Sequence, residues 1–405
     1  MPSITLLLLS LKAQTDILNE ATKLLTFLNQ HNTPHHMFKL LKQSNKARHG
    51  EFTVNSKTIP TPFFMVPSTK AALRHTTMDE FKSLGGNATI CNSMLLSLRP
   101  GAEFINKNGG IHKFMNFDGV TFTDSGGFQV IRQFCLKIDN NGIWFKSPYD
   151  GKKEYLDPQK CIQNHINIDS DVAMCLDHMP LAGATKSEAL YSLNRTTEWA
   201  KLCKETHHQL KENTGSNQLL FGIAQGGIYP ELRKRSIKEI TDIGFDGYAL
   251  GGLAIGEPKK QMFEMMELGG DLLPKNKLRY IMGLGHPLDI VKAVSLGFDC
   301  FDSIFPTQCA RHNHLFTSEG VLKISNKEYK HDQSPIDKNC NCVTCKNYTR
   351  AYIYHITKVD EPIAYQLKTY HNIHFMYDLM KQIQVAIKED RFEEWKEGFV
   401  KNFKK

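Results

Sequence analysis

The chain has 405 residues, of which 41% are hydrophobic and 23% charged, the composition of an ordinary soluble globular protein. Ten cysteines in a chain of this length exclude a disulfide-dense secreted scaffold and favour a reducing compartment. The formal charge of +8 favours polyanionic partners such as nucleic acids, but only weakly, since many basic proteins bind none.

Residues 1–36 are predicted to form an N-terminal extension without a specified structure. Its apolar stretch, SITLLLLSL, has about nine residues, whereas a membrane-spanning helix needs about 20. The extension lacks a basic leading segment and a clear cleavage site, and Asp16 and Glu20 argue against a transit peptide. We therefore expect a cytoplasmic protein with no membrane segment.

Beyond residue 50, eight short apolar runs alternate with stretches of helical pattern. The runs cover residues 61–68, 88–93, 120–127, 171–177, 219–227, 247–253, 279–285 and 300–306. Continuous apolar runs indicate strands buried on both faces, as in parallel sheets, and amphipathic stretches such as 186–212 and 231–244 fit the intervening helices. This alternation predicts an α/β fold, a TIM-type (β/α)8 barrel within residues 37–405. A doubly wound parallel sheet is the alternative.

Polar residues and glycines stand at the carboxyl ends of these runs. They are Asn92, Ser93, Asp124, Ser125, Asp177, Gln225, Gly251, Gly252, Gly283, Gly285 and Asp302. Single polar residues often end strands because turns follow, but in a barrel these ends converge on one mouth, where active sites lie. We therefore expect three carboxylates and one amide to share a pocket.

Asp302 needs its own explanation, because it interrupts the apolar sequence DCFDSIFPT. Burying an ionised carboxylate is costly unless the group is paired or its pKa rises. At the end of the eighth strand, which Pro306 is expected to stop, the acid would emerge at the mouth. Asp299 would lie on the other side of the pleat, with no assigned role.

A cysteine cluster follows the last predicted strand. Cys340, Cys342 and Cys345 form a C-x-C-x2-C pattern, and His371 is the nearest good fourth ligand, with His374 in competition. Three thiolates and one imidazole leave no open coordination position, so we expect one structural zinc ion per chain. Lysines and an arginine surround the cluster, and they fit either a docking surface for phosphates or a merely solvated face.

Several longer motifs resemble those of the tRNA-guanine transglycosylase (queuine tRNA-ribosyltransferase) family. They are RPGAEFINKNGGIHKFMNFDG (99–119), TDSGGFQV (123–130), FGIAQGG (221–227), GFDGYALGGLAIGE (244–257), YIMGLGHP (280–287) and FDSIFPT (301–307). With the cysteine cluster, they keep the family's order from about Arg48 to the C-terminus. The resemblance implies a (β/α)8 barrel with a zinc-binding subdomain at about residues 308–374 and a closing C-terminal helical segment.

The resemblance also implies roles for individual residues. Asp302 corresponds to the nucleophile and Asp124 to the general acid/base. The implied substrate-binding residues are Asp177, Gln225 and Gly252 at the purine edge, Leu253 at the 7-substituent, Phe128 and Met282 on the two faces of the base, and Ser125. The implied zinc ligands are Cys340, Cys342, Cys345 and His371, in preference to His374, and the implied tRNA contact is Arg311.

The function implied is that of a pentosyltransferase in queuosine tRNA modification. Such an enzyme exchanges guanine at the wobble position (34) of tRNAs with GUN anticodons for a 7-deazaguanine base, through a covalent ribosyl-aspartate. Ile255 stands where family members that take queuine tend to have glycine, so we expect 7-aminomethyl-7-deazaguanine to be favoured over queuine. A homodimer is expected, and a heterodimer is the alternative.

Three departures from the family's motifs leave alternatives open. Gln308 replaces a residue that is commonly basic, Met94-Leu95 replace a pair that is often Tyr-His, and His178-Met179 follow Asp177 beside the base pocket. One alternative is a non-catalytic tRNA-binding subunit of a heterodimeric enzyme, against which the retention of both catalytic acids argues. Another is a transglycosylase acting elsewhere in tRNA or on DNA.

Overall fold

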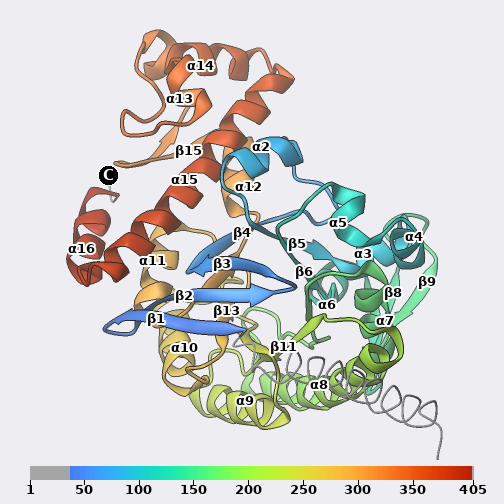
Figure 1. Cartoon of the computed structure of the whole chain (residues 1–405). Helices are drawn as coiled ribbons and strands as arrows, with labels where there is room; N and C mark the ends of the chain where they lie inside the picture. The colour runs from blue at the N-terminus through green and yellow to red at the C-terminus, as the bar shows by residue number, and fades with distance from the viewer. Residues whose placement is uncertain (1–36, 404–405) are drawn as a thin grey trace, which may run out of the picture. The chain divides into compact units, whose positions relative to one another are not determined.

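Eight parallel strands close into a barrel in the computed structural model, which describes residues 37–403 (Figure 1). The strands are β4 (Phe63–Pro67), β5 (Ala88–Asn92), β6 (Val120–Asp124), β10 (Val172–Met174), β11 (Leu219–Ala224), β12 (Gly247–Leu250), β13 (Leu278–Ile281) and β14 (Cys300–Asp302). Their order around the barrel is β10-β11-β12-β13-β14-β4-β5-β6. Each predicted run overlaps one barrel strand, so the barrel prediction is confirmed and the open doubly wound sheet is wrong. The expectations for residues 1–36 lie outside the described part.

Helices connect the barrel strands. Those before β14 are α2 (Met78–Ser83), α3 (Ser93–Leu98), α4 (Ala102–Lys107), α5 (Gly110–Met115), α6 (Gly127–Gln129) with a π-helical turn (Val130–Phe134), α7 (Pro158–Ile168), α8 (Lys186–Thr214), α9 (Pro230–Ile243), α10 (Lys259–Leu272) and α11 (Pro287–Ser295). The two stretches predicted to be helical are α8 and α9. Thr185 and Glu188 form a capping box at the start of α8, and Pro230 suits the first turn of α9. No helix within residues 37–403 combines the length and apolar character needed to cross a membrane.

A three-stranded antiparallel sheet lies across the amino end of the barrel. It consists of β1 (Phe38–Ser44), β2 (Ala47–Val54) and β3 (Lys57–Thr61). Phe52 of β2 is fully buried, and its ring lies 6.5, 6.2 and 6.1 Å from the rings of Phe63, Phe122 and Phe221. These aromatic contacts close the amino end of the barrel. A site that is open to substrates therefore has to lie at the carboxyl end of the strands.

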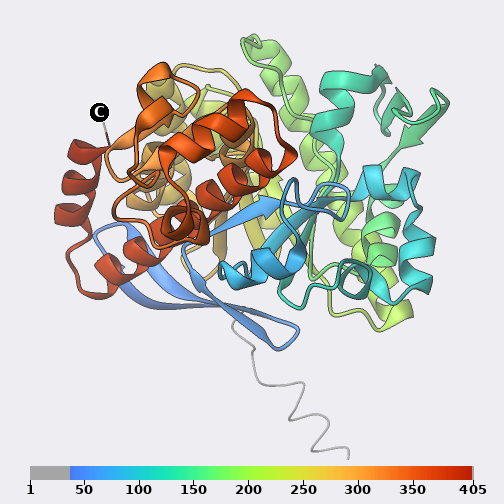
Figure 2. The same ribbon diagram turned by 90° about the horizontal axis from the view of Figure 1, so that it is seen from above.

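Two further insertions extend the barrel. The first is an antiparallel sheet between β6 and α7, made of β7 (Cys135–Ile138), β8 (Ile143–Lys146) and β9 (Lys153–Leu156). The second follows β14 and consists of α12 (Phe305–Arg311), the hairpin β15 (His314–Thr317) and β16 (Gly320–Lys323), a 3-10 helix (Lys327–His331), α13 (Val343–Asn347) and α14 (Arg350–Lys358). Figures 1 and 2 both show the two insertions on different sides of the barrel.

The chain then returns to the barrel through two helices, α15 (Pro362–Lys388) and α16 (Phe392–Asn402). The first half of α15 packs on the second insertion, which has a small apolar core that includes Leu315, Ile324, Ile336 and Ile353. The second half of α15 packs into the main core through residues such as Ile383. One long helix therefore joins the insertion to the barrel.

The prediction for Pro306 is wrong. Strand β14 already ends at Asp302, and Phe305 and Pro306 begin helix α12. Proline suits the first turn of a helix, where its missing N–H has no intrahelical acceptor. The run of apolar residues beyond Asp302 is thus the start of helix α12, which packs against α15.

Candidate active site and metal centre

Asp302 ends β14 and is held by two donors. Its Oδ1 accepts hydrogen bonds from the Tyr280 hydroxyl at 2.5 Å and from the Gly283 N–H at 2.9 Å. Burial raises the pKa of Asp302, while the two hydrogen bonds lower it. Within residues 37–403, Oδ2 has no hydrogen-bond donor. The carboxylate therefore has a fixed orientation and one free oxygen.

Tyr280 contacts the candidate site, although sequence patterns did not indicate it. It lies inside β13, and its side chain is fully buried, as an apolar strand residue would be. Only its hydroxyl shows its role, because it donates to Asp302 on the neighbouring strand. The period-2 alternation of β13 could have placed it on the barrel interior, but not next to an acid.

Asp124 ends β6 and accepts a hydrogen bond from the Gly126 N–H at 2.8 Å. Burial raises its pKa to about 8, and the negative charges of Asp302 and Asp177 raise it further. At neutral pH this carboxyl therefore holds a proton that it can give away. Gly126 has φ of +79°, and a Cβ there would lie 2.5 Å from that of Met94, so the turn requires glycine.

Asp177 and Gln225 meet across neighbouring strands. The Gln225 amide donates to Asp177 Oδ2 at 2.6 Å, and burial raises the pKa of Asp177 to about 6. Among the described residues, Gln225 Oε1 is buried without a hydrogen-bond partner, and a Cβ on Gly252 would lie 2.6 Å from it. A buried acceptor without a donor is costly. Gln225 Oε1, next to the glycine turn at Gly252, is therefore suited to accept a hydrogen bond from a ligand.

Arg233 on α9 supports this edge from behind. Its fully buried guanidinium donates to the carbonyls of Ala224, Gly251 and Gly227 at 2.7, 3.0 and 2.9 Å. These carbonyls flank Gln225 and Gly252 in the chain. One planar side chain thus ties together the ends of β11 and β12. Sequence patterns gave no signal for it, because α9 carries several other basic residues.

The loop after Gly252 is held by Glu257. Its carboxylate accepts hydrogen bonds from the N–H groups of Ala254, Ile255 and Gly256 at 2.5, 3.0 and 3.1 Å. In a trans peptide the N–H and C=O point in opposite directions, so the Leu253 carbonyl points away from Glu257. Met179 Cγ lies 3.5 Å from a Cβ placed on Gly252.

The remaining predicted site residues lie around the same end of the barrel. Phe128 lies on α6 and Met282 directly follows β13, and both are half-buried. Ser125 is buried, and its hydroxyl accepts the Gly127 N–H at 3.2 Å. Arg311 ends α12, with one guanidinium nitrogen buried and unpartnered among the described residues.

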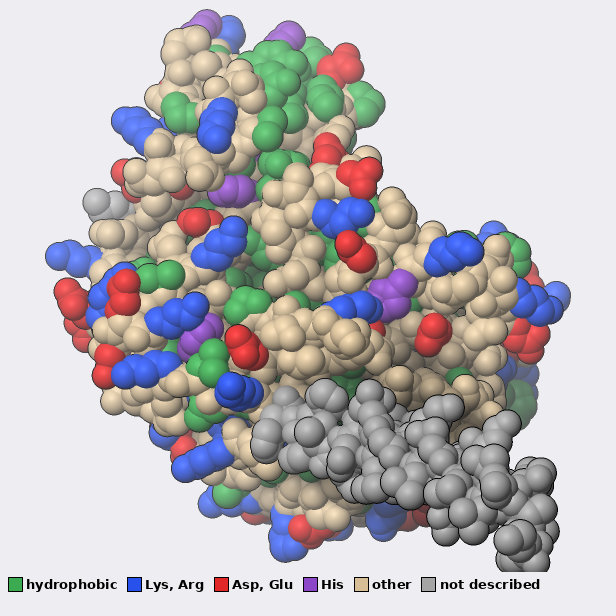
Figure 3. All heavy atoms as spheres, viewed as in Figure 1, with side chains coloured by type: hydrophobic (Ala, Val, Ile, Leu, Met, Phe, Trp, Pro, Cys, Tyr) green, Lys and Arg blue, Asp and Glu red, His purple; other side chains and the backbone are tan. Residues whose placement is uncertain are grey.

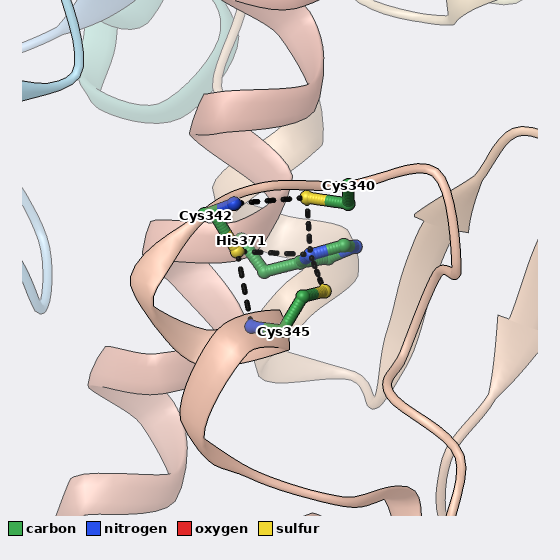
Figure 4. A group of neighbouring side chains, drawn as sticks. All are labelled: Cys340, Cys342, Cys345 and His371. Atoms are coloured by element: carbon green, nitrogen blue, oxygen red, sulfur yellow. Dashed lines mark hydrogen bonds between the residues drawn. The ribbon is translucent and has the colours of Figure 1, made fainter.

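The four predicted metal ligands form one cluster (Figure 4). Their ligand atoms all lie within 4.8 Å of one another, and His371 Nδ1 is 3.7, 3.6 and 3.3 Å from the sulfurs of Cys340, Cys342 and Cys345. Tetrahedral Zn–S and Zn–N bonds of about 2.3 and 2.05 Å imply S···N separations of about 3.5 Å. The geometry therefore fits a tetrahedral metal ion of zinc's size.

The tautomer of His371 agrees with this arrangement. Its Nε2 lies 2.7 Å from the Phe316 carbonyl, so Nε2 carries the proton and Nδ1 is free to bind a metal. His374 approaches only Cys340, at 3.6 Å, and does not belong to the cluster. Of the two histidines, the structure thus selects His371.

Comparison with known proteins adds to this geometry. The family model described as "Queuine tRNA-ribosyltransferase" matches residues 43–405. The chain belongs to the queuine tRNA-ribosyltransferase family. Proteins with that name from Fusobacterium nucleatum and Halothermothrix orenii are 42% and 41% identical to it over 369 residues each, which cover 90% of this chain and 98% and 97% of theirs. The one from Francisella tularensis subsp. novicida is 42% identical and covers 91% of this chain and 99% of its own.

The resemblance predicted from the motifs is therefore confirmed, together with the enzyme class. Queuine tRNA-ribosyltransferases are pentosyltransferases of tRNA modification, and this chain carries the barrel and the cysteine–histidine cluster expected for the family.

Proposed function

We propose that the chain exchanges guanine at position 34 of GUN-anticodon tRNAs for a 7-deazaguanine base, through a covalent ribosyl-Asp302. The observation that carries this proposal is the pair of acids at the barrel mouth. Asp302 offers a fixed carboxylate with a free oxygen, and Asp124 holds a proton at neutral pH because burial raises its pKa to about 8.

The two acids divide the chemistry between them. Asp302 attacks C1′ of the target ribose while the bond from C1′ to guanine N9 breaks, and Asp124 gives its proton to the departing guanine. The incoming base then loses its N9 proton to Asp124, and its N9 displaces Asp302 from C1′. Two displacements retain the configuration, as in retaining glycosidases.

The groups around the acids fit a flipped purine. Asp177, the orphaned Gln225 Oε1 and the Gly252 N–H form a polar edge for the pyrimidine ring of the base, and Phe128 and Met282 offer faces on which it stacks. Ser125 lies buried in the turn that carries Asp124. Arg311 lies at the end of α12, and its unpartnered nitrogen suits a phosphate of the tRNA.

We favour 7-aminomethyl-7-deazaguanine over queuine as the incoming base. Glu257 holds the Leu253–Ala254 peptide so that its carbonyl points away from the carboxylate, which suits an acceptor for an ammonium group. Ile255 follows this peptide in the chain, and Met179 Cγ lies 3.5 Å from a Cβ placed on Gly252. Comparable kcat/KM values for the two bases would overturn this preference.

Labelled-guanine exchange by the purified chain tests the main proposal. The chain alone should incorporate labelled guanine into a GUN tRNA, not into the same tRNA with adenine at position 34, and should form a protein–RNA adduct that survives denaturation. Asp302→Ala should form no adduct. Exchange only after a second subunit is added would instead identify a subunit of a heterodimer. Exchange at another tRNA position or in DNA would identify a different target.

We also propose that the cysteine–histidine cluster binds one zinc ion with a structural role. The four ligands leave no position for a substrate, so bound zinc would fix the fold of the second insertion. Metal analysis should find one zinc per chain, lost in Cys345→Ser and kept in His374→Ala. Retention of zinc by Cys345→Ser would contradict the proposed ligand set.

A homodimer in the cytoplasm is the assembly we propose. Hydrophobic side chains gather on the second insertion, over α13, α14 and the start of α15 (Figure 3). Val343, Tyr352, Val359 and Ile363 are 52, 41, 53 and 41% exposed there, and a second copy would cover them. The molar mass in solution tests this, and Tyr352→Lys should shift it towards the monomer. A heterodimer is the alternative.

A further inference from the structure

Two cations at the barrel mouth share one tyrosine ring. The Lys70 ammonium lies 5.2 Å and the Arg99 guanidinium carbon 4.8 Å from the ring centre of Tyr149. Both cations are exposed, and Tyr149 is half-buried. Within residues 37–403, neither cation has a carboxylate within 4 Å or a side-chain hydrogen bond. Two like charges are thus gathered with no anion beside them.

Two lysines that follow Tyr149 in the chain differ in this respect. Lys152 pairs with Asp150 at 3.3 Å, and Lys160 pairs with Glu154 at 3.5 Å. Like charges that converge without an acid repel one another, and an anion bound between them relieves that repulsion. Lys70 and Arg99 therefore have the electrostatics of an anion site.

The order of the strands places these cations relative to the catalytic acids. Lys70 follows the carboxyl end of β4, and its loop is tied to β5 by the Asn92 N–H, which donates to the Thr69 carbonyl at 3.1 Å. Arg99 ends helix α3, which begins directly after β5. Strands β4 and β5 lie between β14, which carries Asp302, and β6, which carries Asp124. The cations thus border the mouth between the nucleophile and the acid/base.

Tyr149 comes from a third segment and fixes the spacing. It lies in the turn between β8 and β9, where the Ser147 N–H donates to the Lys152 carbonyl at 2.8 Å and the Gly151 N–H to the Ser147 carbonyl at 2.9 Å. The turn is thus closed by backbone hydrogen bonds. Its aromatic ring attracts both cations, which lie 5.2 and 4.8 Å from the ring centre.

We propose that Lys70 and Arg99, positioned by Tyr149, bind a backbone phosphate of the RNA next to the nucleotide whose base is exchanged. This inference rests on the proposed function. The site is specific for phosphate and not for sequence, because both groups are donors without a base-reading geometry. It orients the ribose for Asp302 and contributes to RNA binding, not to recognition of the free base.

Binding and kinetics of alanine variants test the proposal. Lys70→Ala/Arg99→Ala should raise the Kd and the KM for the tRNA about tenfold or more, with the KM for the free base unchanged. The slope of log Kd against log salt should weaken by about 0.7 for one phosphate of a single strand. Tyr149→Phe keeps the ring and should behave as wild type, whereas Tyr149→Ala should weaken tRNA binding.

A double variant at the other end of the barrel is the control. Lys275→Ala/Lys277→Ala removes the same charge from the loop before β13 and should leave the Kd and the salt slope unchanged. Lys70→Ala alone keeps the test decisive if the Arg99 variant folds poorly. An unchanged Kd and salt slope in the Lys70 and Arg99 variants would overturn the inference. The Kd for tRNA is measured without catalysis, so an unchanged Kd tests only this inference. An absence of guanine exchange by the wild type would instead overturn the proposed function.

Discussion

The two ends of the barrel both hold buried acids but compensate them in different ways. At the amino end, Asp299 lies 3.2 Å from the Arg48 guanidinium and accepts the Arg279 N–H at 2.9 Å. Asp171 likewise lies 2.9 Å from the Lys57 ammonium. Each of these acids is paired with a cation and with a backbone N–H of a neighbouring segment, which makes it part of the closure of the barrel.

At the carboxyl end, the acids receive neutral donors instead. Asp302 has a hydroxyl and a peptide N–H, Asp124 a peptide N–H, and Asp177 an amide. Within residues 37–403, no cation lies within 4 Å of them. Burial raises their pKa values. It also raises the pKa of Asp299 to about 6, although the charge of Arg48 opposes this. The two ends therefore differ in the partners of their acids, not in whether burial raises a pKa. A cation at the amino end ties each acid to another segment of the chain, whereas neutral donors at the carboxyl end leave one oxygen of Asp302 without a partner among the described residues.

The largest expected effect is that of Asp302→Asn. It removes the proposed nucleophile and should lower the exchange rate by about 10⁴-fold or more. The melting temperature should stay the same or rise, because the variant removes a buried charge that has no cation. Labelled-guanine exchange and thermal unfolding measure the two effects. Activity within tenfold of wild type would remove Asp302 from the chemistry.

Asp299→Asn, three residues earlier in the chain, should lower stability and leave the exchange rate nearly unchanged. It leaves the buried Arg48 without its partner and should cost about 3 kcal/mol of unfolding free energy. Urea unfolding measures this, and kcat of the folded fraction should change little. The double variant with Arg48→Met should recover part of the loss. A loss of kcat without a loss of stability would contradict the structural role.

Arg233 and Arg279 offer a matched pair of buried arginines. Arg279 donates to the carbonyls of Gly270 and Leu273 at the amino end, whereas Arg233 holds the carbonyls beside Gln225 and Gly252. Lysine cannot serve several carbonyls in one plane, so both lysine variants should lower the melting temperature. Only Arg233→Lys should raise the KM for the free base, about tenfold, the effect of roughly 1.4 kcal/mol. Equal KM values would assign Arg233 to stability alone.

Asp124 should make both activity and stability depend on pH. Its pKa of about 8 means that exchange should fall as the pH rises through 8, because the proton for the leaving guanine is lost. Since its ordinary value is 3.8, the folded state binds more protons than the unfolded state between these values. The contribution of Asp124 to stability therefore falls as the pH rises from about 4 to 8.

Asp124→Asn provides the control for that prediction. Its exchange activity should be low at every pH, and its melting temperature should exceed that of wild type by a margin that widens up to about pH 8. A constant difference between the two proteins across this range would show that the pKa of Asp124 is not raised by burial.

Sequence patterns predicted the parts of the fold whose signals are local. The barrel strands are buried on both faces, so each is an unbroken apolar run. The sheet β1–β3 gave no such signal, because β1 exposes several residues, Lys39 and Leu40 among them. The apolar stretch around Phe305 was predicted to be a strand because its length and composition suit a strand or a helix. Only the position of Pro306 in the first turn of α12 distinguishes the helix from the strand.

The candidate site divides in the same way. Asp124, Asp177 and Asp302 were predictable because acids at strand ends stand out from apolar neighbours. Tyr280 and Arg233 were not, because their partners come from other strands and their own surroundings in the chain are unremarkable for a strand and a helix. The ion pair between Arg48 and Asp299 joins residues far apart in the chain. It could not be predicted from sequence patterns, because it forms only when the barrel closes.

Closure of the barrel also has a consequence for the order in which the protein becomes active during synthesis. Strand β14, with Asp302, is the last barrel strand to leave the ribosome, and it pairs with β4, the first. An incomplete chain that ends before residue 300 can contain Asp124, Asp177 and Gln225 but lacks Asp302, the proposed nucleophile. Under the proposed function, nascent chains are therefore unable to break the bond between base and sugar until the sheet is complete.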